Sequence, residues 1–144
     1  MEEFKSLSTS LEVINSTNDF GTDTPTGSYD AATGIITFGA DEYMNIRSAY
    51  GATPYYLVDG YYRVEIVFKN INSDKSVRVQ HFSGCDNFSL MGEASKGETI
   101  KYEFPFYYDS AATCPNLEDN VVFRFTGDEG KQTQLVSIKV YEAN

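Results

Sequence analysis

Apolar side chains recur at every second residue over much of this chain, and this alternation restricts the possible folds more than any other sequence feature. The clearest alternating runs are YYRVEIVFK at 61–69, SVRVQHF at 76–82, ETIKYEFPF at 98–106, NVVFRF at 120–125 and QLVSIKVY at 134–141. Alternation is typical of β-strands that bury one face, and the three-and-four spacing of an amphipathic helix is nearly absent. We therefore predict an all-β protein.

Weaker alternation predicts four more strands, at 10–14, 34–38, 43–48 and 87–91. Turn-rich stretches separate several of the strands: INSDK at 71–75, GEASKG at 92–97 and GDEGK at 127–131. About nine short strands with frequent turns are typical of an antiparallel β-sandwich. We predict one such domain over residues 1–144, of the jelly-roll type.

The alternation also predicts which side chains form the core. In the strand at 61–69, Val64, Ile66 and Phe68 would face inward. A hairpin through residues 70–75 would pair them with the next strand, opposite His81, Val79 and Val77. The later strands would add Ile100, Tyr102, Phe104, Phe106, Phe123, Phe125, Val136, Ile138 and Val140.

Composition narrows the class of protein. The chain is 41% hydrophobic and 22% charged, which excludes a disordered chain, and no apolar run approaches the roughly 18 residues of a membrane helix. A formal charge of −10 with eleven Lys and Arg disfavours nucleic acid as a partner. The first residues, Met-Glu-Glu-Phe, show no secretion signal, although a removed signal would leave the same sequence.

The order of the strands places the loops at two ends of the sandwich, because consecutive antiparallel strands alternate in direction. The connections 70–75, 92–97 and 127–131 should share one end. The connections 83–86 and 107–119 should share the other end with Tyr61. Cys85 and Cys114 would then lie close enough for a disulfide, which would imply an oxidising compartment. The alternative is two unpaired thiols.

Tyrosine is the residue type that most strongly indicates a binding site in this chain, which has no tryptophan. Successive side chains of a strand point to opposite faces, so the phases above bury Tyr62 and Tyr108 and leave Tyr61 and Tyr107 facing outward at the same end. Tyr55 and Tyr56 lie either beside them or at the other end, beyond a possible hairpin turn at Asp59-Gly60. An exposed ring with a polar tip can stack on a sugar, although strands also favour tyrosine for its packing.

Polar residues offer weaker candidates for a site. Arg78 and Gln80, with Arg63 and Arg124, could supply hydrogen bonds from outward strand positions. Glu65 and Glu103 are expected to be solvated carboxylates, and no motif of a catalytic site is present, so no catalytic residue is predicted. The oxygen-rich loop at 18–23 is either an ordinary turn or a structural calcium site.

Three segments resemble strands of the jelly-roll carbohydrate-binding modules found beside glycoside hydrolases and lyases. They are GYYRVEIVF at 60–68, NVVFRF at 120–125 and LVSIKV at 135–140, within the last 85 or so residues. The resemblance implies non-catalytic binding of a polysaccharide, often with a structural calcium ion. The lack of tryptophan favours single soluble chains over crystalline cellulose, and the acidic balance disfavours an anionic glycan unless an arginine cluster overrides it.

These observations together predict a secreted or cell-surface module that binds polysaccharide through Tyr61, Tyr107, Tyr55, Tyr56, Arg78 and Gln80. Binding would need no cofactor, and the resemblance implies a covalently linked catalytic domain as partner. One alternative is a structural or adhesive β-sandwich that binds a protein. Another is a small enzyme, such as a lyase, that uses Tyr and Arg.

Overall fold

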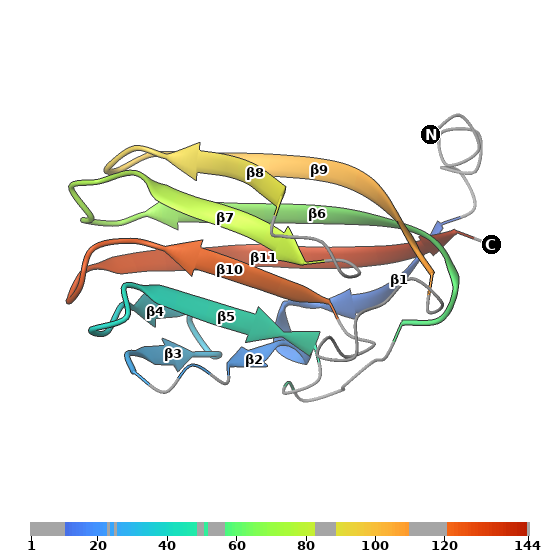
Figure 1. The fold of residues 1–144 in the computed structure, drawn as a ribbon, viewed down its shortest axis with the longest axis horizontal. Coiled ribbons are helices and arrows are strands. Elements are labelled where there is room, and N and C mark those ends of the chain that lie inside the picture. The colour runs from blue at the N-terminus through green and yellow to red at the C-terminus, as the bar shows by residue number, and fades with distance from the viewer. Residues whose placement is uncertain are drawn as a thin grey trace.

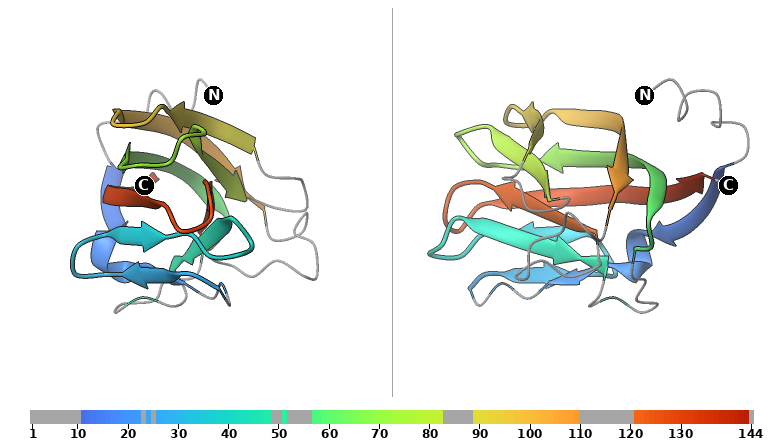
Figure 2. Two further views of the ribbon diagram at one scale, coloured as in Figure 1. Left: turned by 90° about the vertical axis from the view of Figure 1, so that its left-hand side faces the viewer. Right: turned by 45° about the vertical axis from the view of Figure 1, so that its right-hand side comes forward.

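Two antiparallel β-sheets packed face to face make up the fold (Figures 1 and 2). The computed structural model describes residues 11–22, 24, 26–48, 51, 57–82, 89–109 and 121–143. Sheet A contains β3 (Ser28–Asp30), β4 (Ile35–Thr37), β11 (Gln132–Ala143), β6 (Gly60–Asn70) and β9 (Thr99–Tyr108) in that order, with β1 (Leu11–Ser16) also paired to β11. Sheet B contains β2 (Gly21–Thr22), β5 (Tyr43–Arg47), β10 (Val122–Thr126), β7 (Val77–Phe82) and β8 (Ser89–Ala94), and a 3-10 turn, η2, spans Thr17–Asp19.

The strand order is that of a jelly roll. From β4 to β11 the chain forms two interleaved four-stranded sheets, β4-β11-β6-β9 and β5-β10-β7-β8. From β4 to β11, every connection except that from β7 to β8 joins a strand of one sheet to a strand of the other. The predicted all-β jelly-roll sandwich is therefore confirmed. β1 pairs with the C-terminal part of β11, with Leu11 opposite Ala143.

The core lies between the two sheets and contains most of the side chains that alternation assigns to it. Val64, Ile66, Phe68, Val77, Val79, Phe123, Phe125, Ile138 and Val140 are all buried to 2% exposure or less. His81 is also buried, with its ring 4.9 Å from that of Phe104 and 5.2 Å from that of Phe123. Burial lowers the pKa of His81 to about 3, so this imidazole is neutral at pH 7.

The predicted hairpin through residues 70–75 is wrong. β6 pairs with β11 and β9 in sheet A, whereas β7 pairs with β10 and β8 in sheet B. Residues 70–76 cross from one sheet to the other, so the predicted inward residues of β6 and β7 meet across the core and not within one sheet. Alternation survives this change because both strands still turn their apolar faces toward the interior.

Two side chains predicted for the core lie at the surface. Val136 is 48% exposed because the register of β11 against β6 shifts between Leu135 and Ser137, and this bulge turns Leu135 inward in its place. Tyr102 is 39% exposed because β9 is the edge strand of sheet A. Its ring lies so close to Gly92, on edge strand β8, that a Cβ atom there would overlap it.

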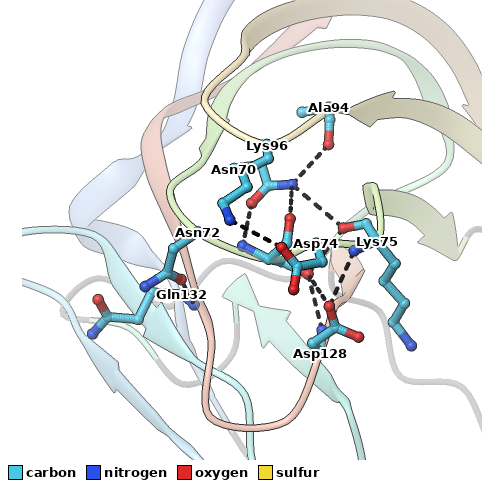
Figure 3. A network of polar contacts seen from close by, with 9 residues as sticks. Asn70, Asn72, Asp74, Lys75, Ala94, Lys96, Asp128 and Gln132 are labelled. Carbon is cyan, nitrogen blue, oxygen red and sulfur yellow. Dashed lines mark hydrogen bonds and ion pairs between the residues drawn. The ribbon is translucent and has the colours of Figure 1, made fainter.

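Three connections meet at the left of Figure 1, as the strand directions predict, and polar contacts join them (Figure 3). The buried Asn70 amide donates to the carbonyl oxygens of Ser73 at 3.1 Å, Ala94 at 3.1 Å and Lys75 at 3.4 Å. Its Oδ1 accepts from the backbone N–H of Ser73 at 2.9 Å. The Asp128 carboxylate accepts from the backbone N–H of Lys75 at 3.0 Å. The loops at this end therefore form one hydrogen-bonded unit.

Asn70→Ala is expected to lower the free energy of unfolding by about 2 kcal/mol, because the carbonyl oxygens of Ser73 and Ala94 and the backbone N–H of Ser73 would lose this partner in a buried setting. Urea unfolding measures the change. Lys96→Ala is the matched control at the same end, since it removes an exposed ion pair to Asp74 and should change stability by less than about 0.5 kcal/mol. Equal effects of the two substitutions would contradict the role given to Asn70.

None of the described residues forms a helix long and apolar enough to cross a membrane.

Candidate functional site

Tyr61 and Tyr107 lie side by side on the outer face of sheet A. They are direct partners in the register where β6 begins and β9 ends, and their ring centroids are 4.7 Å apart at 60°. Tyr107 is 51% exposed and Tyr61 partly exposed, whereas Tyr62 and Tyr108 are buried. The predicted orientation of all four tyrosines is confirmed.

The next row of the same face continues this surface. Arg63 on β6 stands between Pro105 on β9 and Tyr141 on β11, and its guanidinium carbon is 5.0 Å from the centre of the Tyr141 ring. Pro105 is exposed. We call Tyr61, Tyr107, Pro105, Arg63 and Tyr141 the tyrosine shelf. It offers flat apolar faces beside a cation that is fixed by stacking.

Arg78 and Gln80 lie on a different surface, the outer face of sheet B. They alternate with the buried Val77, Val79 and His81, so both point away from the core. Since the two sheets turn their outer faces in opposite directions, these residues cannot contact the same short segment of ligand as Tyr61 and Tyr107. The structure therefore divides the predicted site into two surfaces.

Arg124 is at the centre of the outer face of sheet B. Its register partners are Asn45 on β5 and Gln80 on β7. Its guanidinium carbon is 4.1 Å from the centre of the Tyr43 ring, and its Nε donates to Asn45 Oδ1 at 2.9 Å. We call Arg47, Arg78, Arg124, Asn45, Gln80 and Tyr43 the arginine face.

Sequence reasoning missed several members of these two surfaces. Tyr43, Asn45 and Arg47 occupy alternate positions of a strand that was predicted, so their outward direction was available from the pattern. Their contact with Arg124 depends on the pairing of β5 with β10, which alternation does not reveal. Tyr141 ends an alternating run, and its place beside Arg63 depends on the register of β11 against β6.

Other predicted residues lie outside the described part of the chain. They are Tyr55, Tyr56, Cys85 and Cys114, so their roles in binding and in a disulfide stay predictions. In the 18–23 loop, Phe20 is buried in the core and the Thr22 hydroxyl donates to Met44 Sδ at 2.7 Å, while Asp23 is outside the description. Calcium binding there also stays a prediction.

Acidic side chains on the outer face of sheet A are engaged in ion pairs. Lys101 Nζ lies 3.8 Å from Glu65 and 3.3 Å from Glu103. In the described ranges, no group of three or more His, Cys, Asp or Glu is placed to hold a metal ion. Glu65 and Glu103 thus lie on the outer face of the sheet, where both form ion pairs with Lys101.

Solved structures with a similar fold are carbohydrate-binding modules. A mutant of CBM29-2, from family 29, matches with 17% identity and a TM-score of 0.45, over 92% of this chain and 91% of that one. The CBM22-1–GH10 modules of Clostridium thermocellum xylanase 10B, solved with xylohexaose, match with 12% identity and a TM-score of 0.48, over 93% of this chain and 28% of that one.

A third match is CBM6cm-2 from Cellvibrio mixtus lichenase 5A, solved with cellotriose, with 13% identity and a TM-score of 0.38 over 92% of this chain and all of the other. No protein-family model matches the sequence. No curated protein matches it either. These structures contain carbohydrate-binding modules, the class that the sequence resembles, and they do not assign the chain to a numbered family.

Proposed function

We propose that this chain binds a polysaccharide without cleaving it and that the tyrosine shelf makes the main contact. The observation that carries the proposal is the paired, outward arrangement of Tyr61 and Tyr107, with Tyr107 half exposed. A tyrosine ring buries the apolar face of a sugar, and its hydroxyl bonds the sugar's own hydroxyl groups.

Arg63 suits the shelf as a directional donor. Its stacking on Tyr141 restricts the guanidinium before any ligand arrives, so less conformational entropy is lost on binding. The Tyr61 and Tyr107 rings are tilted by 60° to each other, so they do not form one flat surface. Such a shelf fits a single twisted chain better than a flat crystal surface.

The remaining parts of the proposal concern the wider site and setting. Tyr55 and Tyr56 would extend the shelf, and Arg78 and Gln80 would contact ligand from the arginine face. The module would act outside the cell or at its surface, where polymeric substrates occur, and would keep a linked catalytic domain near its substrate. No catalytic role is proposed for any residue.

Tyr107→Ala is expected to weaken polysaccharide binding about tenfold or more, if a sugar ring gains from stacking about as much as a nucleic-acid base, for which one aromatic ring contributes about 1–3 kcal/mol. Affinity electrophoresis in xylan, glucomannan, β-glucan and pectin measures binding. Tyr107→Phe is the matched control, because it keeps the ring and removes only the hydroxyl, and it should retain most of the affinity.

Two results would overturn the proposal. One is the absence of retardation in every polysaccharide while the purified chain captures a protein partner, which would favour an adhesive domain. The other is release of reducing ends or unsaturated products from these polymers, which would show an enzyme. Thermal unfolding of both variants checks that any loss of binding does not reflect loss of the fold.

A further inference from the structure

We infer that the arginine face of sheet B is a second binding surface and that its ligand is a polysaccharide carrying carboxylate groups, such as a uronic-acid chain. This shares with the proposed function the polysaccharide class of the ligand and the contacts of Arg78 and Gln80, and it adds the carboxylate groups. It concerns the opposite side of the sandwich and does not require the tyrosine shelf to bind.

The distribution of arginine is the first observation. The chain carries a formal charge of −10, and its arginines are Arg47, Arg63, Arg78 and Arg124. All except Arg63 lie on the outer face of sheet B, on β5, β7 and β10. A basic surface on an acidic protein concentrates opposite charge locally and so attracts an anionic ligand despite the net charge.

The three arginines follow a diagonal across the sheet. Arg124 is central, Arg78 lies on β7 opposite Thr126, and Arg47 lies on β5 opposite Val122. Neighbouring strands are about 4.8 Å apart and two residues advance about 6.8 Å, so each step of the diagonal is about 8 Å between Cα atoms. The three arginine positions therefore form an extended line, which suits a repeating anionic polymer better than a single small anion.

The central arginine is held in place. Its guanidinium lies over the Tyr43 ring and its Nε donates to Asn45 Oδ1, so two contacts restrict the group. A planar guanidinium pairs with a carboxylate through two parallel hydrogen bonds. The amides of Asn45 and Gln80, on either side of Arg124, can donate to and accept from sugar hydroxyls.

Carboxylates are few among the described strand residues of sheet B. Among the described strand residues of sheet B, Glu93 is the one carboxylate whose register places it there, opposite Arg78. Arg78 and Glu93 are both exposed, and no ion pair is formed by Arg78 within the described residues. On sheet A, in contrast, Lys101 is in contact with two glutamates. Among the described strand residues of sheet B, three arginines therefore stand against one carboxylate.

Nucleic acid also carries negative charge, but it fits this face less well. Its affinity comes from many Lys and Arg contacts to a densely charged backbone, and acidic surfaces around the contact oppose it. Three arginines on a chain with a formal charge of −10 supply too few phosphate contacts for strong binding of nucleic acid. A polysaccharide with separated carboxylates and many hydroxyls matches both the arginines and the flanking amides.

The test compares polymers that differ only in their carboxylates. Binding to polygalacturonate, alginate and glucuronoxylan is measured beside binding to the carboxyl-reduced form of each polymer. At least one acidic polymer should bind about tenfold or more tightly than its reduced form, with affinity that falls as salt rises. The double variant Arg78→Gln, Arg124→Gln should lose that preference, whereas Lys139→Gln, at an exposed position of sheet A outside the tyrosine shelf, should keep it.

Three outcomes would overturn the inference: equal or absent binding of all acidic and reduced pairs, an unchanged preference in the double variant, or equally tight binding of a single-stranded oligonucleotide. Its failure is distinguishable from failure of the proposed function. If the chain binds neutral polymers and Tyr107→Ala abolishes that binding, the proposal for the tyrosine shelf still holds. Unfolding temperatures of all variants identify any loss of fold, and Arg78→Gln alone, at an exposed position, provides a variant that should fold normally.

Discussion

Lowering the pH from 7 to 4 is expected to remove about 3 kcal/mol from the free energy of unfolding through His81 alone. This side chain is buried against Phe104 and Phe123, and burial lowers its pKa from 6.5 to about 3. As the pH falls through about 6.5, His81 therefore binds a proton in the unfolded chain but stays neutral in the folded chain. The stabilisation is complete above pH 6.5 and is lost progressively as the pH falls toward about 3.

His81→Phe isolates this effect, because phenylalanine keeps a ring among the same aromatic neighbours and has no proton to bind. Urea unfolding is measured at several pH values for both proteins. The difference in their free energies of unfolding should change by about 1.4 kcal/mol per pH unit between about 6.5 and 4. Asp128, whose pKa is lowered chiefly by the hydrogen bond from the backbone of Lys75, is present in both and cancels. A constant difference would show that His81 binds its proton equally well in the folded and the unfolded chain, which would contradict the prediction.

Gly34→Ala is expected to cost about 3 kcal/mol or more. Gly34 ends the turn between β3 and β4 with a φ of +77°, in the left-handed region that penalises any side chain. A Cβ atom there would also overlap the backbone carbonyl oxygen of Leu135. The turn is hydrogen-bonded to the same residue, since the Leu135 N–H donates to Gly34 O at 2.8 Å. Relief of the overlap would break that contact between the turn and β11.

Gly97→Ala separates the two causes. Gly97 has a similar φ of +82°, but a Cβ atom built on it meets nothing within 4 Å. This control should cost only the backbone strain of about 1–2 kcal/mol. For a domain of this size, each kcal/mol lowers the unfolding temperature by about 3 °C, so the two variants should differ clearly in a thermal melt. Equal melting temperatures would show that the contact with Leu135 does not restrict position 34.

The sequence was sufficient to predict which way most strand residues face, because side-chain direction alternates locally along a strand. Pairing was not predictable in the same way. The inward residues of β6 and β7 have compatible phases whether the two strands share a sheet or face each other across the core, and the structure has the second arrangement. Consecutive apolar residues at Leu135 and Val136 likewise gave no sign of which one the bulge exposes. β2 and β3 are too short for alternation to reveal them.

The candidate site shows the same division between local and long-range information. Alternation correctly separated the outward Tyr61 and Tyr107 from the buried Tyr62 and Tyr108. It could not reveal that Arg78 belongs to the other sheet, since sheet membership depends on how the chain crosses between layers. The cluster around Arg124 depends on the pairing of three strands that are far apart in sequence.

The pairing of β1 with β11 determines how the fold would respond to mechanical load. Leu11 lies opposite Ala143, so the antiparallel ladder begins where the first and last strands come together. A force that pulls residues 11 and 143 apart would open the ladder one pair of hydrogen bonds at a time, like a zipper, instead of shearing all of them at once. The first strand would therefore detach at low force, while β4 and β6 stay hydrogen-bonded to β11.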